Sequence, residues 1–221
     1  MAPLVALNTV VAALFILVTF LLMVSRQIQS VLRAFVWQSL LLALSTLILA
    51  VLHGSLELVF VAAITVAAKA VVIPAVLTRT LRPELRARRE IASAVNVPVS
   101  LLLMLGLSVF SYFLVAPLLT GGTPGASVNL PLGLAALLIA VYTLAIRREA
   151  VAQVLGLMAI DNGAFFAGVA ITSSSAIVEM AAGLEGVMVV LVVAILTRTI
   201  AQRVGSTRVD TLQDLKEGVP L

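Results

Sequence analysis

The sequence contains no cysteine, and histidine occurs once among its 221 residues. Without cysteine the chain cannot form a disulfide, ligate an iron–sulfur cluster or use a thiol nucleophile. One histidine is also too few for a haem or zinc site built within this chain. We therefore expect no cofactor, no metal and no catalytic residue here, and any redox chemistry belongs to a partner.

Charged residues are scarce as well, at 11% of the chain, whereas 62% of the residues are hydrophobic and the mean hydropathy is +1.22. A soluble domain has about 25% charged residues. This composition excludes a water-soluble enzyme. The formal charge of +4 does not indicate nucleic acid, because the arginines stand between apolar runs and not on a solvated basic face.

Apolar windows of about 20 residues, the length that crosses a bilayer core, occur seven times. They cover 4–24, 31–52, 56–77, 97–119, 130–146, 151–171 and 176–197. The first window has no basic residues before it and no small-residue cleavage site after it, so we expect a mature helix and not a signal peptide. The sequence thus predicts an all-α integral membrane protein with seven transmembrane helices.

If all seven windows span, thirteen of the fourteen Lys and Arg residues lie on one side of the membrane. These are Arg26, Arg33, Arg79, Arg82, Arg86, Arg88, Arg89, Arg147, Arg148, Arg198, Arg203, Arg208 and Lys216. The opposite connectors, 53–55, 120–129 and 172–175, contain none. By the positive-inside rule, we expect an outside N-terminus and a cytoplasmic C-terminus in a prokaryotic plasma (inner) membrane.

The third and seventh spans end in similar sequences, AVLTRTL at 75–81 and AILTRTI at 194–200. We predict two parallel three-helix repeats, 1–81 and 130–203, because each also has an arginine-bearing turn after its first helix. Residues 82–129 then supply a cytoplasmic connector, one return helix and an outer loop, and 204–221 form a cytoplasmic tail. The stretch 78–96 is typical of an amphipathic surface helix, and the tail has an apolar stripe that could contact a partner or stay solvated.

Lys69, Asp161 and Glu185 fall near the bilayer midplane, counted from the arginines at the ends of their spans. A charge at that depth costs about 2.5–3.5 kcal/mol on insertion scales, so these residues are candidates for a proton path. Glu57 and Glu179, near the outer ends of spans three and seven, are further candidates.

Each candidate also has a purely structural interpretation. Lys69 and one acid could form an ion pair that fixes packing, and Asp161 with Asn162 and Gly163 could interrupt a helix. Glu185 could face a polar group of a partner. The outer acids and His53 could be interfacial, and residues 37–39 of span two form a weaker polar spot.

The second repeat resembles the three-helix K-type subunit of respiratory complex I, and the whole chain resembles the hydrogenase-4 component E family of membrane-bound [NiFe]-hydrogenase and formate-hydrogenlyase-type complexes. The residues that carry this resemblance are 146–148 (IRR), 156–157 (GL), Asn162, 181–185 (AAGLE), 196–198 (LTR) and 209–210 (VD). In the K-type pattern a glutamate follows Gly-Leu directly. Here Met158 stands at that position, and Asp161 follows one turn later on nearly the same helix face.

The resemblance implies a subunit without cofactor or activity of its own. Such a subunit would lie between antiporter-like membrane subunits and the membrane anchor of a redox module. It would contribute buried titratable groups to a lateral proton path. Two other interpretations stay open from the residues: a self-contained small proton- or cation-coupled transporter using Glu185 and Asp161, and a structural membrane scaffold.

Overall fold

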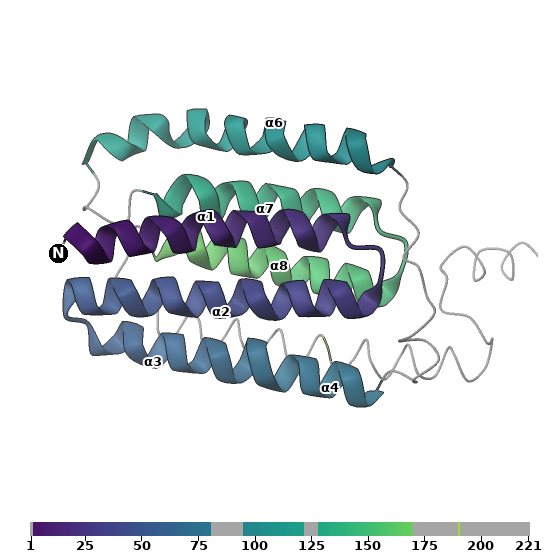
Figure 1. The fold of residues 1–221 in the computed structure, drawn as a ribbon, viewed down its shortest axis with the longest axis horizontal. Helices are drawn as coiled ribbons and strands as arrows, with labels where there is room; N and C mark the ends of the chain where they lie inside the picture. Colours follow the sequence, from purple (N-terminus) through teal and green to yellow (C-terminus); the bar gives the residue numbers. More distant parts are fainter. Residues whose placement is uncertain (1, 81–94, 122–127, 170–189, 191–221) are drawn as a thin grey trace, which may run out of the picture.

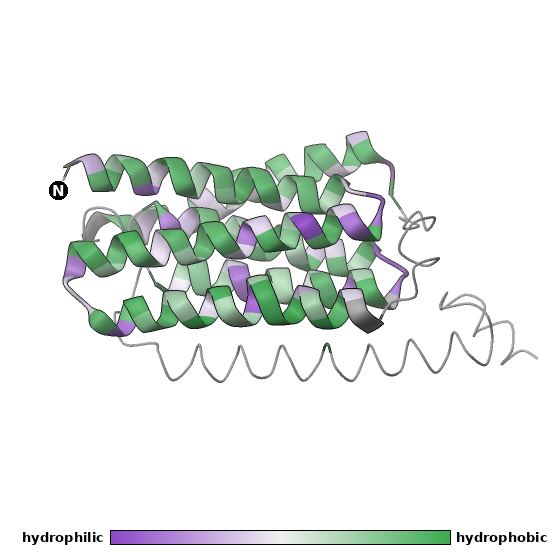
Figure 2. Ribbon diagram, turned by 60° about the horizontal axis from the view of Figure 1, so that its bottom comes forward, coloured by the Kyte–Doolittle hydropathy of each residue, from purple (hydrophilic) through white to green (hydrophobic). Residues whose placement is uncertain are grey.

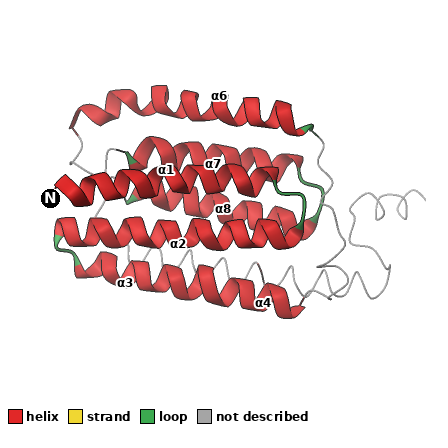
Figure 3. Ribbon diagram, viewed as in Figure 1, coloured by secondary structure: helices red, strands yellow, loops and turns green. Residues whose placement is uncertain are grey.

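In the computed structural model, residues 2–80, 95–121, 128–169 and Val190 are described. These residues are helical, with short connectors and no strand (Figure 3). The helices are α1 (Ala2–Val24), α2 (Ile28–His53), α3 (Leu56–Thr65), η1 (Val66–Val72), α4 (Ile73–Thr80), α6 (Val97–Val115), η2 (Ala116–Gly121), α7 (Asn129–Ile146) and α8 (Ala150–Gly168).

Six stretches of the described chain are long and apolar enough to cross a membrane, and α3, η1 and α4 together make one of them, Leu56–Thr78. Six of the seven predicted windows are thereby confirmed as helices. The seventh window, the tail 204–221 and most of 78–96 lie outside the described residues. Arg33, which we counted with the connectors, lies inside α2 with its side chain exposed.

The bundle is layered around four helices, α1, α2, α7 and α8, which share the main apolar core (Figure 1). The segment α3–η1–α4 flanks α2 on one side, and α6 flanks α7 on the other. Most of the α6 surface is apolar and exposed. Hydrophilic residues gather at the connectors and in a few bands inside the bundle (Figure 2).

Helices α1 and α7 lie side by side and run in the same direction. Asn8 contacts Asn129 near the beginnings of these helices, and Arg147 contacts Met23 at their ends. Helices α2 and α8 are likewise neighbours that run in one direction (Figure 1). The α1–α2 and α7–α8 turns, which carry Arg26, Arg147 and Arg148, therefore lie at one end of the bundle, hereafter the arginine end.

At the opposite end, α2 turns into α3 within two residues. Gly54 adopts a left-handed conformation, with φ 65°, and its N–H bonds to the Ala50 carbonyl. This is a common helix C-terminus in which glycine avoids the penalty of a Cβ. The Ser55 side chain then accepts from the Leu58 N–H and caps α3.

Helices α7 and α8 approach each other closely because glycine lies at their contact. A Cβ built on Gly163 would lie 2.5 Å from the Leu137 backbone nitrogen, and one on Gly133 would lie 2.4 Å from that of Ala167. Small residues allow this approach in membrane bundles, where van der Waals packing between helices replaces the hydrophobic driving force.

We expect Gly163→Ala to destabilise the protein by about 1–3 kcal/mol, because the added methyl group on α8 must push the backbone of α7 away. Gly106→Ala in α6 is the matched control, since nothing lies within 4 Å of a Cβ at that position. Thermal unfolding in a mild detergent measures both variants. Equal melting temperatures for the two would contradict the close α7–α8 contact.

Candidate functional site

An ion pair joins the third membrane stretch to α8 inside the bundle. The Lys69 ammonium nitrogen lies 2.5 Å from Oδ2 of Asp161. The side chain of Lys69 is 3% exposed, whereas that of Asp161 is 36% exposed. The ammonium also lies 5.9 Å from the centre of the Phe165 ring, within range of a cation–π interaction. An ammonium group that is removed from water almost completely must be compensated by nearby groups, and the Asp161 carboxylate and the Phe165 ring do this here.

Lys69 lies in η1, a seven-residue π-helical segment between α3 and α4. The neighbouring Pro74 explains this geometry, because proline has no N–H and its ring clashes with the carbonyl four residues earlier. The N–H of Ile73 bonds to the Ala68 carbonyl, five residues back. The wider turn relieves the clash at Ala70. Such π segments are frequent at functional sites.

A cluster of uncharged polar side chains includes Asn162 of α8, the residue that follows Asp161. Its two amides, Gln38 of α2 and Asn162, are hereafter the midbundle amides, and its two hydroxyls are Thr19 of α1 and Ser39 of α2. Gln38 Nε2 donates to Thr19 Oγ1 at 2.8 Å, and Asn162 Nδ2 donates to Gln38 Oε1 at 3.2 Å and to Ser39 Oγ at 3.0 Å. All four side chains are buried. Asn162 follows Asp161 directly in the sequence, so the cluster and the ion pair lie at the same depth of α8.

One acceptor of this cluster has no partner among the described residues: the buried Oδ1 of Asn162. A buried amide oxygen without a donor costs about 1–3 kcal/mol. The position is therefore suited to an ordered water or a hydroxyl donor.

A second buried cluster, towards the opposite end, joins Asn8 of α1, Ser45 of α2 and Asn129 of α7. Asn8 Nδ2 donates to Asn129 Oδ1, Asn129 Nδ2 donates to Ser45 Oγ, and Ser45 Oγ donates to Asn8 Oδ1, at 2.8, 2.8 and 2.6 Å. These bonds close a ring. None of its members titrates near neutral pH, so we assign it to packing of the three helices.

Among the residues singled out in the sequence, the structure brings together Lys69 and Asp161. Glu57 lies apart from them, exposed in the first turn of α3 and twelve residues before Lys69, roughly 18 Å along the helix. His53 is exposed in the last turn of α2. Glu179 and Glu185 lie outside the described residues.

Two sequence interpretations need correction. Helix α8 continues without a break from Ala150 to Gly168, so Asp161 and its neighbours do not interrupt it. Trp37 is 61% exposed and does not join the polar spot expected in α2, whereas Gln38 and Ser39 point into the bundle.

Sequence reasoning missed Thr19 and the ring of Asn8, Ser45 and Asn129. The available signal was weak: each is an uncharged polar residue within an apolar window, and such residues also occur on lipid-facing helix surfaces.

The described chain is thus an all-helical protein with membrane-length helices and an ion pair between them, in which the lysine is buried and the aspartate is partly exposed. It is similar to the uncharacterized protein Rv0085 of Mycobacterium tuberculosis, with 29% identity over 204 residues that cover 91% of this chain and 92% of that protein. No protein-family model matches the chain, and no solved structure matches it.

The ion pair predicts unequal effects of its two neutral variants on stability. Asp161→Asn leaves a buried ammonium without its carboxylate and should cost about 3 kcal/mol, whereas Lys69→Met leaves the more exposed carboxylate and should cost less. The double variant should recover to within about 1 kcal/mol of the parent, because neither charge is then left alone. Thermal unfolding of all four proteins in one detergent measures this cycle. Additive losses in the double variant would show that the two charges do not interact.

Proposed function

We propose that this chain is a non-catalytic membrane subunit of a complex-I-like hydrogenase or a related redox-driven ion pump. It contributes buried titratable groups to a lateral proton path and bridges antiporter-like subunits and the membrane anchor of a redox module. The observation that carries the proposal is the Lys69–Asp161 pair together with the midbundle amides. The resemblance to hydrogenase-4 component E and the K-type subunit supplies the biological setting.

The direction of the polar groups supports a lateral path. Their hydrogen bonds connect α8 to α2 and α2 to α1, across the helices rather than along any one of them. A chain of groups that crosses the bundle at one depth joins neighbours in the membrane plane, whereas a transmembrane pore requires groups at successive depths. The ion pair places one basic and one acidic side chain together between the third membrane stretch and α8.

We extend the proposal to the topology: seven spans, two parallel three-helix repeats and the arginine end in the cytoplasm. The common direction of α1 with α7 and of α2 with α8 supports the repeat. So does the recurrence of LTRT at 77–80 and 196–199. The positive-inside rule supports the orientation.

Because the chain has no cysteine, one introduced thiol reports its own side of the membrane. We expect His53→Cys to react with a membrane-impermeant maleimide in intact cells, and Gln27→Cys to react after the membrane is opened. Both side chains are exposed at opposite ends of α2. The reverse pattern would place the arginine end outside.

A second candidate function is a self-contained proton- or cation-coupled transporter, in which Asp161 and Glu185 bind the ion. The π segment at Lys69 favours it, because transporter sites are often built where a membrane helix is irregular. Purification of the tagged full-length chain from its native membranes in a mild detergent separates the two functions. A subunit brings large membrane partners and a redox module with it, whereas a transporter is recovered without them.

In the recovered complex, Glu185→Gln should keep the assembly and electron-transfer rate but lower the protons taken up per electron in membrane vesicles. Asp161→Asn should act in the same direction but less strongly, because Asp161 lies one turn from the position at which the K-type pattern has its acid. Lys69→Met should weaken the coupling without abolishing assembly. Glu57→Gln, at the exposed beginning of α3, is the matched control. If Glu185→Gln and Asp161→Asn both kept full coupling, the two acids would not belong to a proton path, and the structural scaffold would be the remaining interpretation.

A further inference from the structure

At the arginine end, the buried guanidinium of Arg147 caps the C-terminal end of α1. Arg147 follows the last residue of α7 and is 3% exposed. Its Nη2 donates to the carbonyls of Met23 and Ser25, the latter at 2.8 Å. The last carbonyls of a helix have no partner within it, and a cation there also interacts favourably with the helix dipole. Nη2 thus holds the α7–α8 turn against the end of α1.

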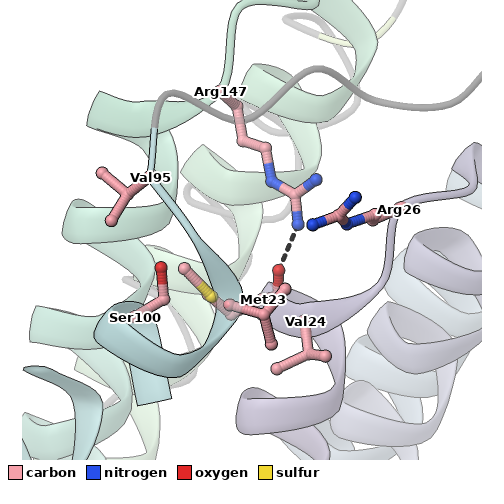
Figure 4. Close-up of a pocket in the computed structure, with 7 residues that line it drawn as sticks. Met23, Val24, Arg26, Val95, Ser100 and Arg147 are labelled. Carbon is pink, nitrogen blue, oxygen red and sulfur yellow. Dashed lines mark hydrogen bonds between the residues drawn. The ribbon is translucent and has the colours of Figure 1, made fainter. Parts of the chain in front are cut away.

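The other terminal nitrogen of Arg147 has no such role. Nη1 is buried and has no hydrogen-bond partner among the residues that the structure describes. Arg147 also lines a cavity together with Arg26, Ser100, Met23 and Val24, and with the beginning of α6. Figure 4 shows the guanidinium groups of Arg26 and Arg147 next to each other, although both are positively charged. The space measures about 10 Å³, which is room for one oxygen atom.

The electrostatics of this pocket favour an anion. Burial lowers the pKa of Arg147, Arg26 lowers it further, and Glu149 raises it by less than Arg26 lowers it. The neighbouring charges therefore sum to a positive field at a guanidinium that stays protonated. An anionic oxygen between Arg26 and Arg147 offsets the repulsion between the two positive charges, and it also supplies an acceptor for Nη1.

We propose that Arg26 and Arg147 bind the phosphate of an anionic phospholipid. One phosphate oxygen enters the cavity and accepts from Nη1 of Arg147, and the rest of the headgroup stays at the mouth beside Arg26, which is exposed. The pocket lies at the ends of membrane-length helices, at the level where lipid headgroups are found. The exposed apolar residues of α6, which begins at this pocket, provide an adjoining surface for the acyl chains.

The charge of the pocket indicates the lipid class. In phosphatidylcholine the phosphate is already compensated by the ammonium of its own headgroup. In phosphatidylglycerol it is not, so its full charge remains for the arginines. The planar guanidinium suits a phosphate because its N–H groups match the spacing of two phosphate oxygens.

The test uses purified, delipidated full-length protein in a neutral detergent, and it measures the rise in melting temperature with added ligand. The probes are short-chain phosphatidylglycerol, short-chain phosphatidylcholine and sodium phosphate. We expect phosphatidylglycerol to stabilise the parent protein at lower concentration than either of the others. Arg26→Gln should raise its half-saturating concentration about tenfold, the usual effect of losing one charged hydrogen bond.

Two further variants make the result specific. Arg33→Gln, an exposed arginine of α2 that does not line the pocket, should bind phosphatidylglycerol as the parent protein does. Arg147→Lys keeps the charge but not the two-nitrogen geometry, and should lose the preference for phosphatidylglycerol even if its melting temperature is lower throughout.

Each alternative result overturns the proposal in a distinct way. Equal effects of phosphatidylglycerol and phosphatidylcholine would indicate that the pocket does not select a net negative headgroup. An equal effect of sodium phosphate would identify a site for the free anion. An unchanged half-saturating concentration of phosphatidylglycerol in Arg26→Gln would mean that the lipid binds elsewhere on the protein. None of these outcomes depends on whether the chain belongs to a proton-pumping complex.

Discussion

The buried ammonium of Lys69 needs a counter-charge from the protein, and the centre of the bundle is arranged to provide it. In hydrocarbon no water is present to solvate a charge or an unpaired polar group, so every partner must come from the protein. Asp161 supplies the counter-charge and Phe165 supplies the face of its ring. Both lie on α8, and this fixes the rotation of α8 relative to the third membrane stretch. Because α8 also packs closely on α7, the ion pair is linked to the position of α7.

The same constraint explains the other polar residues of the interior. Several hydroxyl groups need no partner from another helix, because Thr19, Thr46 and Thr143 donate to the carbonyl four residues earlier. Amides cannot be satisfied in this way. Asn8, Asn129, Gln38 and Asn162 instead bond between helices, and these bonds join α1, α2, α7 and α8. The four helices with cross-helix amide bonds are those that share the apolar core.

The six described spans could be predicted from the sequence because hydropathy and charge position decide whether a segment enters a membrane. Lys69 and Asp161 could be singled out individually, because a charge within an apolar window is costly. Their pairing could not be predicted, since depth along a helix does not fix rotation about its axis, and Glu185 had a comparable depth. The π segment could not be predicted either. Pro74 indicates an irregularity in the helix, but the sequence does not show that the irregular turn contains Lys69.

The polar groups at the centre divide into those that can carry a proton and those that can only orient one. Lys69 and Asp161 are ionisable, whereas the midbundle amides neither gain nor lose a proton near neutral pH. The amides can still bind a water, and Oδ1 of Asn162, which has no partner among the described residues, is the acceptor available for one. In the proton path that we propose, Asp161 is the member of the pair that other groups can reach, because its side chain is 36% exposed and that of Lys69 is 3% exposed. A proton path through this bundle therefore requires a further titratable group or a water chain in contact with Asp161.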